Sequence, residues 1–152
     1  MPNTDDALFA DLDATPALLR TAFAASGDRA TTAPAGGEWS LADLLNHLRA
    51  SDAIISTRVY QVLTRDGAHL LGFDERVWGD LYKAAAIDPR AQLEQFALRR
   101  AEFVAILRAL TPEQFARAGR HEERGLMTIT DLCQMLAGHE ADHRAQIDQP
   151  PS

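Results

Sequence analysis

Cysteine is almost absent, because Cys133 is the single one among 152 residues. One thiol cannot form an intrachain disulfide or supply the several thiolates of a cysteine-rich zinc site. Cys133 follows Leu132 inside a predicted helix, and we therefore expect an inert, buried thiol. A catalytic thiol is the less favoured alternative, because nothing nearby gives an obvious reason for a lowered pKa of the thiol.

Aromatic residues, long apolar runs and basic charge are scarce as well. Aromatics make up 7% of the chain, and the abundance of Ala and Leu favours helix over sheet. No apolar run is long enough to span a membrane, and the acidic start Met1–Asp6 does not resemble a signal peptide, which predicts a cytoplasmic protein. The net charge of −7 argues against a nucleic-acid partner, since binding phosphates requires clustered Lys and Arg.

Four segments carry apolar residues at helical spacing. They cover residues 5–26, 40–64, 88–110 and 128–148. Ser40 with Asp43 three residues later, and Thr128 likewise, have the pattern of helix N-caps, and Asp88-Pro89 has that of a cap followed by proline. Thr15-Pro16 has the same pattern inside the first segment, so we expect a kink or a restart there.

These segments predict an all-α single domain, residues 1–152 with a core of about 5–148, folded as a four-helix bundle. The connection between the second and third main helices, residues 65–87, is the longer and less regular one, with a short helix expected near Glu75–Lys83. The polar stretch Gly119–Gly125 is predicted to be a loop. His121 within it, and His69 in the longer connection, are expected to be exposed.

His139 and His143 lie four residues apart, which places both imidazoles on one helix face, about 5–6 Å apart at Cβ. They continue the apolar stripe of Leu132, Leu136 and Ile147. Buried polar groups need partners, and one metal ion would serve both rings. The alternative is a pair of exposed or otherwise satisfied histidines.

His47 is the candidate for a third ligand, because it lies beside the apolar stripe of the second helix. Three imidazoles leave at least one coordination position open, as in catalytic sites, and imidazole suits zinc, nickel, copper and iron. Asp52 falls inside the same stripe and should pair with an arginine of another helix. Glu140 and Asp142 point elsewhere on the helical wheel, which favours solvated or helix-pairing roles over general base.

A series of short motifs resembles the DinB-like family over about Leu8 to Ile147. The motifs are Glu38-Trp39-Ser40-Leu41, Asn46-His47-Leu48, His121 and Gly125 ahead of Met127-Thr128-Ile129, and His139-Glu140-x-x-His143-x-x-Gln146-Ile147. The family includes YfiT-type metal-dependent hydrolases and thiol-dependent S-transferases and isomerases. The resemblance implies an up-up-down-down four-helix bundle, often a homodimer, with a divalent metal on His47, His139 and His143.

The resemblance does not select a reaction, so several functions stay open. The first is a metal-dependent enzyme in which zinc or nickel activates a low-molecular-weight thiol co-substrate, as an S-transferase or isomerase, or activates water, as a hydrolase. The others are a non-catalytic, stress-related metal-binding module and a metal-free bundle. The catalytic residues are unassigned. Arg58, Arg99 and Arg100 are candidates to bind the carboxylate of a small-molecule substrate.

Overall fold

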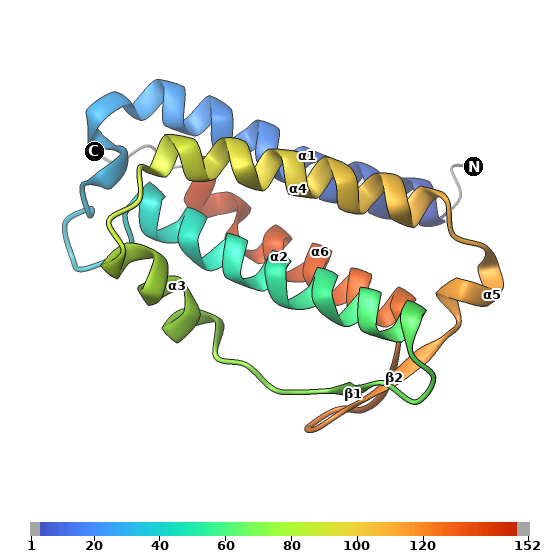
Figure 1. Cartoon of the computed structure of the whole chain (residues 1–152). Helices are drawn as coiled ribbons and strands as arrows, with labels where there is room; N and C mark the ends of the chain where they lie inside the picture. Colours follow the sequence, from blue (N-terminus) through green and yellow to red (C-terminus); the bar gives the residue numbers. More distant parts are fainter. Residues whose placement is uncertain (1–3, 149–152) are drawn as a thin grey trace.

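The computed structural model describes residues 4–148, and the predicted tail Gln149–Ser152 lies outside the described residues. Four long helices form two layers, with α1 beside α4 over α2 and α6 (Figure 1). This arrangement confirms the predicted four-helix bundle. The long helices are α1 (Thr4–Ser26), α2 (Leu41–Thr64), α4 (Pro89–Arg108) and α6 (Ile129–Asp148).

The helix directions differ from the expected up-up-down-down order. α1 and α6 run one way, and α2 and α4 run the other, so the order along the chain is up-down-down-up (Figure 1). The cause is the connection of residues 65–88, which carries the chain back along the bundle and makes α2 and α4 parallel. This connection holds β1 (His69–Leu70) and α3 (Glu75–Ala84), and α3 is the short helix that the sequence predicts. A 3₁₀ turn, η1 (Gly27–Thr31), follows α1.

Side-chain caps fix where the helices begin. Ser40 Oγ accepts from the Asp43 backbone N–H at 3.1 Å, and Asp43 Oδ2 accepts from the Ser40 backbone N–H at 3.1 Å. Thr128 and Asp131 exchange the same two bonds before α6, and Asp88 caps α4. Each cap satisfies backbone donors that the first helical turn leaves free, so the predicted starts are confirmed.

The predicted restart at Thr15-Pro16 is wrong, because α1 is one helix with Pro16 inside it. Proline has no N–H to donate to the carbonyl four residues earlier, which is that of Leu12. In the folded protein, Arg100 Nη1 donates to this freed carbonyl at 2.7 Å. A partner from another helix thus replaces the missing bond, and Thr15 uses its hydroxyl in the interior instead of capping.

The predicted loop at Gly119–Gly125 is instead part of a small sheet. β2 (Ala118–His121) pairs antiparallel with β3 (Gly125–Thr128) and parallel with β1, after the short helix α5 (Pro112–Phe115). A Cβ at Gly119 would come within 3.0 Å of the Leu70 and Val62 side chains, so glycine lets β2 approach the bundle. As a result, His121 is 5% exposed rather than solvated. His69 is exposed, as predicted.

The core has two apolar clusters at different levels of the bundle. One cluster includes Leu12, Ile55, Phe103 and Leu136, and the other includes Leu19, Leu48, Phe96 and Ile147. Between the two levels, each long helix contributes a buried polar residue to one shared hydrogen-bond network. These residues are Thr15 on α1, Asp52 on α2, Arg100 on α4 and Glu140 on α6.

Candidate metal centre

Three histidines from two helices meet at one point, as the sequence predicts. His47 of α2 faces His139 and His143 of α6, and each offers a ligand atom within 4.8 Å of the others. His47 Nε2 lies 2.8 Å from His139 Nε2. Two imidazole nitrogens bound tetrahedrally to one zinc ion would lie roughly 3.3 Å apart. The cluster therefore fits a single divalent ion, with small adjustments of the side chains.

The protein alone does not satisfy the hydrogen-bonding groups of these rings. His47 and His139 can share only one hydrogen bond, and the Nδ1 atom of each is buried with no partner among the described residues. Burial and the neighbouring His139 and His143 lower the pKa of His47 to about 4, and burial also lowers the pKa of His139. Both rings are therefore neutral near pH 7, which is the form that binds a metal.

Two side chains orient the cluster. The Trp39 ring lies 4.7 Å from the His47 ring and stacks on His143 at 6.1 Å, measured between centroids. His143 Nδ1 hydrogen-bonds to Oε1 of Gln146. Because a carbonyl oxygen only accepts, Nδ1 carries the proton and Nε2 keeps its lone pair free, as in many metal-bound histidines.

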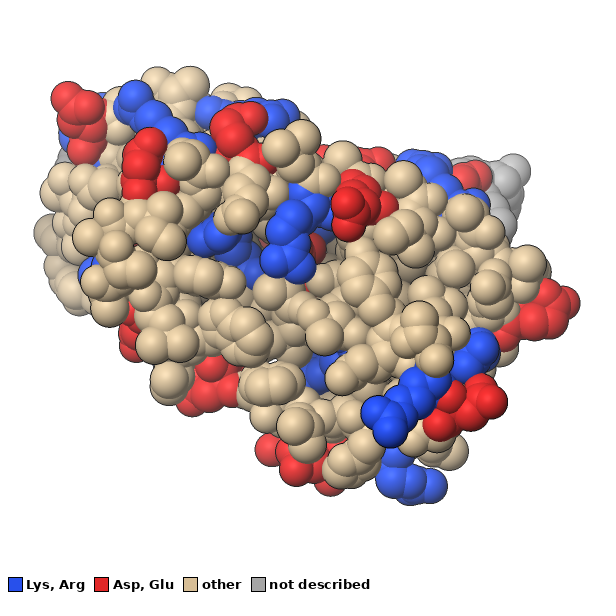
Figure 2. Space-filling view, in the orientation of Figure 1, with Lys and Arg blue, Asp and Glu red and all other residues tan. Residues whose placement is uncertain are grey.

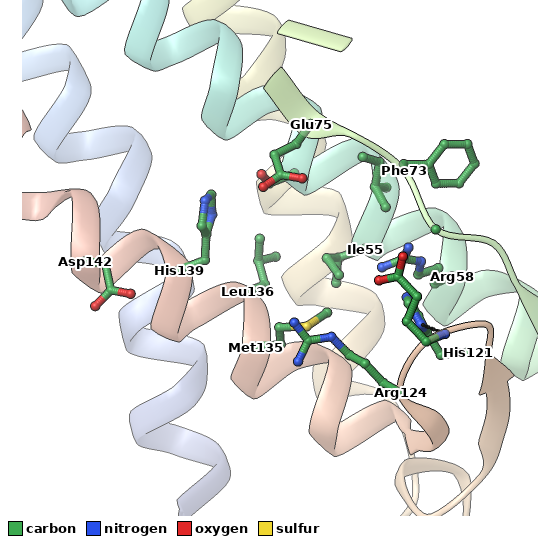
Figure 3. Close-up of a pocket in the computed structure, with 14 residues that line it drawn as sticks. Ile55, Arg58, Phe73, Glu75, His121, Arg124, Met135, Leu136, His139 and Asp142 are labelled. Atoms are coloured by element: carbon green, nitrogen blue, oxygen red, sulfur yellow. Dashed lines mark hydrogen bonds between the residues drawn. The ribbon is translucent and has the colours of Figure 1, made fainter. Parts of the chain in front are cut away.

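A cavity of about 400 Å³ reaches the histidine cluster at His139. In Figure 3, His139, Glu75 and Asp142 lie at one end of it, and Arg58 and His121 lie at the other. Its size is within the usual range for small-molecule sites. The other residues that line it are Ser51, Ile54, Ile55, Gly72, Phe73, Glu123, Arg124, Met135 and Leu136.

Glu75 at the start of α3 is a site residue that the sequence analysis does not identify. It lines the cavity beside His139, and its negative charge favours the charged forms of both His47 and His139. It comes from the irregular connection, whose path over the bundle cannot be read from helical periodicity. Asp142 is exposed and lines the same end of the cavity.

A buried polar layer lies directly behind the cluster. Arg100 Nε and Nη2 donate to Asp52 Oδ1 at 3.0 and 2.9 Å, which confirms the predicted arginine partner of Asp52. Arg100 Nη1 donates to Glu140 Oε2 at 3.0 Å, Nη2 donates to the other oxygen of Glu140, and Thr15 Oγ1 donates to Oε2 at 2.6 Å. Glu140 follows His139 in the chain, so this layer fixes the rotation of α6 about its axis. Glu140 therefore has the helix-pairing role that its position on the helical wheel favours.

The three candidate arginines have different locations. Arg100 is 1% exposed and donates to Asp52, Glu140 and a backbone carbonyl, so its proposed contact with a substrate is corrected to a structural role. Arg99 is exposed on α4, with Nη2 3.5 Å from Ser56 Oγ, and does not line the cavity. Arg58 does line the cavity.

Three further features concern the cysteine, the surface charge and the hydropathy of the helices. Cys133 is buried, as predicted, and burial raises the pKa of its thiol to about 12. Figure 2 shows basic and acidic side chains interspersed on one face of the molecule, without a continuous basic area over its described residues. Between residues 4 and 148, no helix combines the length and hydropathy of a membrane-spanning segment.

The chain belongs to the DinB superfamily, whose family model matches residues 11–147. It is 26% identical over 140 residues to a Bacillus subtilis protein named "Putative metal-dependent hydrolase YfiT", covering 91% of this chain and 79% of that one. A Geobacillus kaustophilus protein of the same description is 28% identical over 134 residues, with 87% and 75% covered. The solved structure of YfiT matches with a TM-score of 0.83 at 25% identity, over 97% of this chain and 85% of that chain. Its title describes a probable metal-dependent hydrolase with an unusual four-helix bundle topology.

Proposed function

We propose that this protein is a metal-dependent enzyme whose His47, His139 and His143 hold one divalent ion, zinc or nickel. The observation that carries the proposal is the meeting of three imidazoles at the end of a cavity large enough for a small molecule. The description of the relatives as metal-dependent supports it. Three neutral ligands leave the full positive charge of the ion in place, which favours an anionic fourth ligand.

The reaction that we favour is transfer of a small thiol to an electrophile. A divalent ion held here would lower the pKa of a thiol bound beside it and keep the resulting thiolate nucleophilic. In this proposal Glu75 takes the thiol proton, because it lines the same cavity as His139 and lies near enough to influence the charge of that ring. Glu140 cannot do so, because Arg100 and Thr15 already bind both of its oxygens in the interior.

Hydrolysis is the second candidate, because the same site can activate water instead of a thiol. The names of the relatives, as metal-dependent hydrolases, favour it. A non-catalytic metal-binding module is the third. Such a module would hold the ion without converting any substrate in the cavity.

The test is thiol consumption with a chloro-nitroaromatic electrophile, using protein reconstituted with zinc or nickel and glutathione, mycothiol or bacillithiol. We expect turnover with the wild type and none with His47→Ala, while His69→Ala, which changes an exposed histidine, should keep it. Equal rates of thiol consumption for wild type and His47→Ala with every thiol would exclude the transferase function. Hydrolysis of activated esters, lost in His47→Ala, would then favour the hydrolase over the module.

A further inference from the structure

Arg58 is a buried cation without an anionic partner. It is 6% exposed, and Nη2 donates to the backbone carbonyl of Leu71, while Nε has no partner among the described residues. No carboxylate within residues 4–148 forms an ion pair with it, although Glu123 and Glu75 lie near enough to influence its charge. A buried charge is costly unless it is paired, so this guanidinium is suited to receive an anion from a ligand.

His121 supplies a second donor at the same end of the cavity. Its Nδ1 accepts a hydrogen bond from the Glu123 backbone N–H at 3.1 Å, so the ring proton of the neutral form is on Nε2. Burial, and then the positive charge of Arg58, lower the pKa of His121, which keeps the ring neutral and Nε2 a donor near pH 7. Arg124, exposed on the same hairpin, also lines the cavity and adds positive charge there.

The spacing on α2 joins this end of the cavity to the metal centre. His47 and Arg58 are eleven residues apart, which is three helical turns, so they lie on one face of α2 at roughly 16 Å along its axis. Ile54 and Ile55 lie between them, and Leu136 of α6 forms the opposite wall. Figure 3 shows Ile55 and Leu136 between His139 and the end that holds Arg58 and His121. The middle of the cavity, between its two polar ends, is therefore largely apolar.

We propose that Arg58 and the Nε2–H of His121 form a carboxylate-binding subsite at the far end of the cavity. The substrate class is then small carboxylates with an apolar segment between the carboxylate and the group that reacts at the histidine cluster. This proposal rests on the proposed function only for the group that reacts at the histidine cluster, and the carboxylate subsite itself does not depend on it. The carboxylate could belong to the thiol itself or to the electrophile that accepts it.

The probes are 6-mercaptohexanoate and 6-mercaptohexan-1-ol, which share the thiol and the chain and differ in the terminal charge. Both are titrated calorimetrically into zinc-loaded wild type, Arg58→Met and Arg99→Met. Arg58→Met replaces an unpaired buried cation by an apolar side chain of similar length, and an unchanged or higher melting temperature will show that it folds. Arg99→Met is the matched control, because Arg99 lies outside the cavity lining.

We expect wild type and Arg99→Met to bind the carboxylate at least about tenfold more tightly than the alcohol, as charge-assisted hydrogen bonds provide. Arg58→Met should bind both thiols equally, with its affinity for the alcohol unchanged. A preference for the carboxylate that persists in Arg58→Met overturns the subsite. Equal binding of the two thiols by the wild type also overturns it, and leaves the proposed thiol chemistry standing.

Hexanoate, which has no thiol, separates this proposal from the proposed function and identifies the source of the carboxylate. If neither thiol binds, the thiol chemistry fails, and hexanoate binding to metal-free wild type but not to Arg58→Met still supports the subsite. Absence of hexanoate binding in that case overturns the subsite too. If hexanoate binds after 2-mercaptoethanol has saturated the zinc, the carboxylate belongs to the electrophile. If hexanoate does not bind under that condition, but 6-mercaptohexanoate still binds more tightly than 6-mercaptohexan-1-ol, the carboxylate belongs to the thiol.

Discussion

His139 and Glu140 are consecutive on α6, yet their side chains belong to different structures. His139 Nε2 lies 2.8 Å from His47 Nε2, whereas Glu140 Oε2 accepts a 3.0 Å bond from Arg100 in the interior. Residues adjacent in a helix point about 100° apart, so fixing Glu140 on one side directs His139 to the other. The polar layer is therefore part of what positions the histidine cluster.

Replacing Arg100 should be far more destabilising than replacing Asp52. Arg100→Met leaves two carboxylates buried without their cation, and we expect a loss of about 3–5 kcal/mol in the free energy of unfolding. Asp52→Leu leaves the Arg100–Glu140 pair intact and should change stability by about 1 kcal/mol or less. Urea unfolding of the two variants measures both values, and similar losses would show that the layer does not act as a charge network.

Metal binding should depend on His143 and should stabilise the fold. We expect about one divalent ion per chain in purified protein, a count that follows from the one histidine cluster found within residues 4–148. Chelation should lower the melting temperature, because an ion at a hundred times its Kd contributes about 2.7 kcal/mol. His143→Ala should lose most of the ion, whereas His69→Ala should not. Equal metal content in all three proteins, measured after identical loading, would place the ion elsewhere.

The thiol of Cys133 should be unreactive in the folded protein. Burial holds its pKa at about 12, so almost none of the nucleophilic thiolate exists at pH 8. Labelling with Ellman's reagent should be slow in buffer and complete in denaturant. Rapid labelling without denaturant would mean that the apolar cluster around Leu132 and Leu136, which holds Cys133, opens readily.

We expect a homodimer. Family resemblance supports it, and so do exposed apolar side chains such as Leu98 on α4, which is 73% exposed, and Leu81 on α3, which is 64% exposed. Light scattering at micromolar concentration should give about twice the mass of one chain. A single-chain mass that does not change with concentration would exclude the dimer in that range.

Local chemistry made the helix starts predictable, because the cap at Ser40 depends only on Asp43 three residues later. The three histidines were predictable for a similar reason, since helical spacing and the family motifs both point to them. The continuous helix at Pro16 could not be predicted locally, because Arg100, which is 84 positions away in the sequence, completes the bonding of the Leu12 carbonyl.

Non-local contacts also explain the remaining differences. The sheet at His121 forms because Gly119 can approach Leu70 and Val62 of other segments, which no local pattern in a polar stretch reveals. The buried polar layer was predictable only in part. Asp52 interrupts an apolar stripe and therefore indicates a buried partner, whereas Glu140 and Thr15 give no such local signal and join the layer through contacts between different helices.

The crossover of residues 65–88 has a consequence for how such proteins can diversify. All three candidate metal ligands belong to α2 and α6, whereas Phe73 and Glu75 of the crossover line the cavity. Insertions, deletions and substitutions in this segment can therefore change the shape of the cavity while the arrangement of the three histidines stays the same. An ancestral bundle of this kind could give rise to enzymes with different substrates and the same metal chemistry.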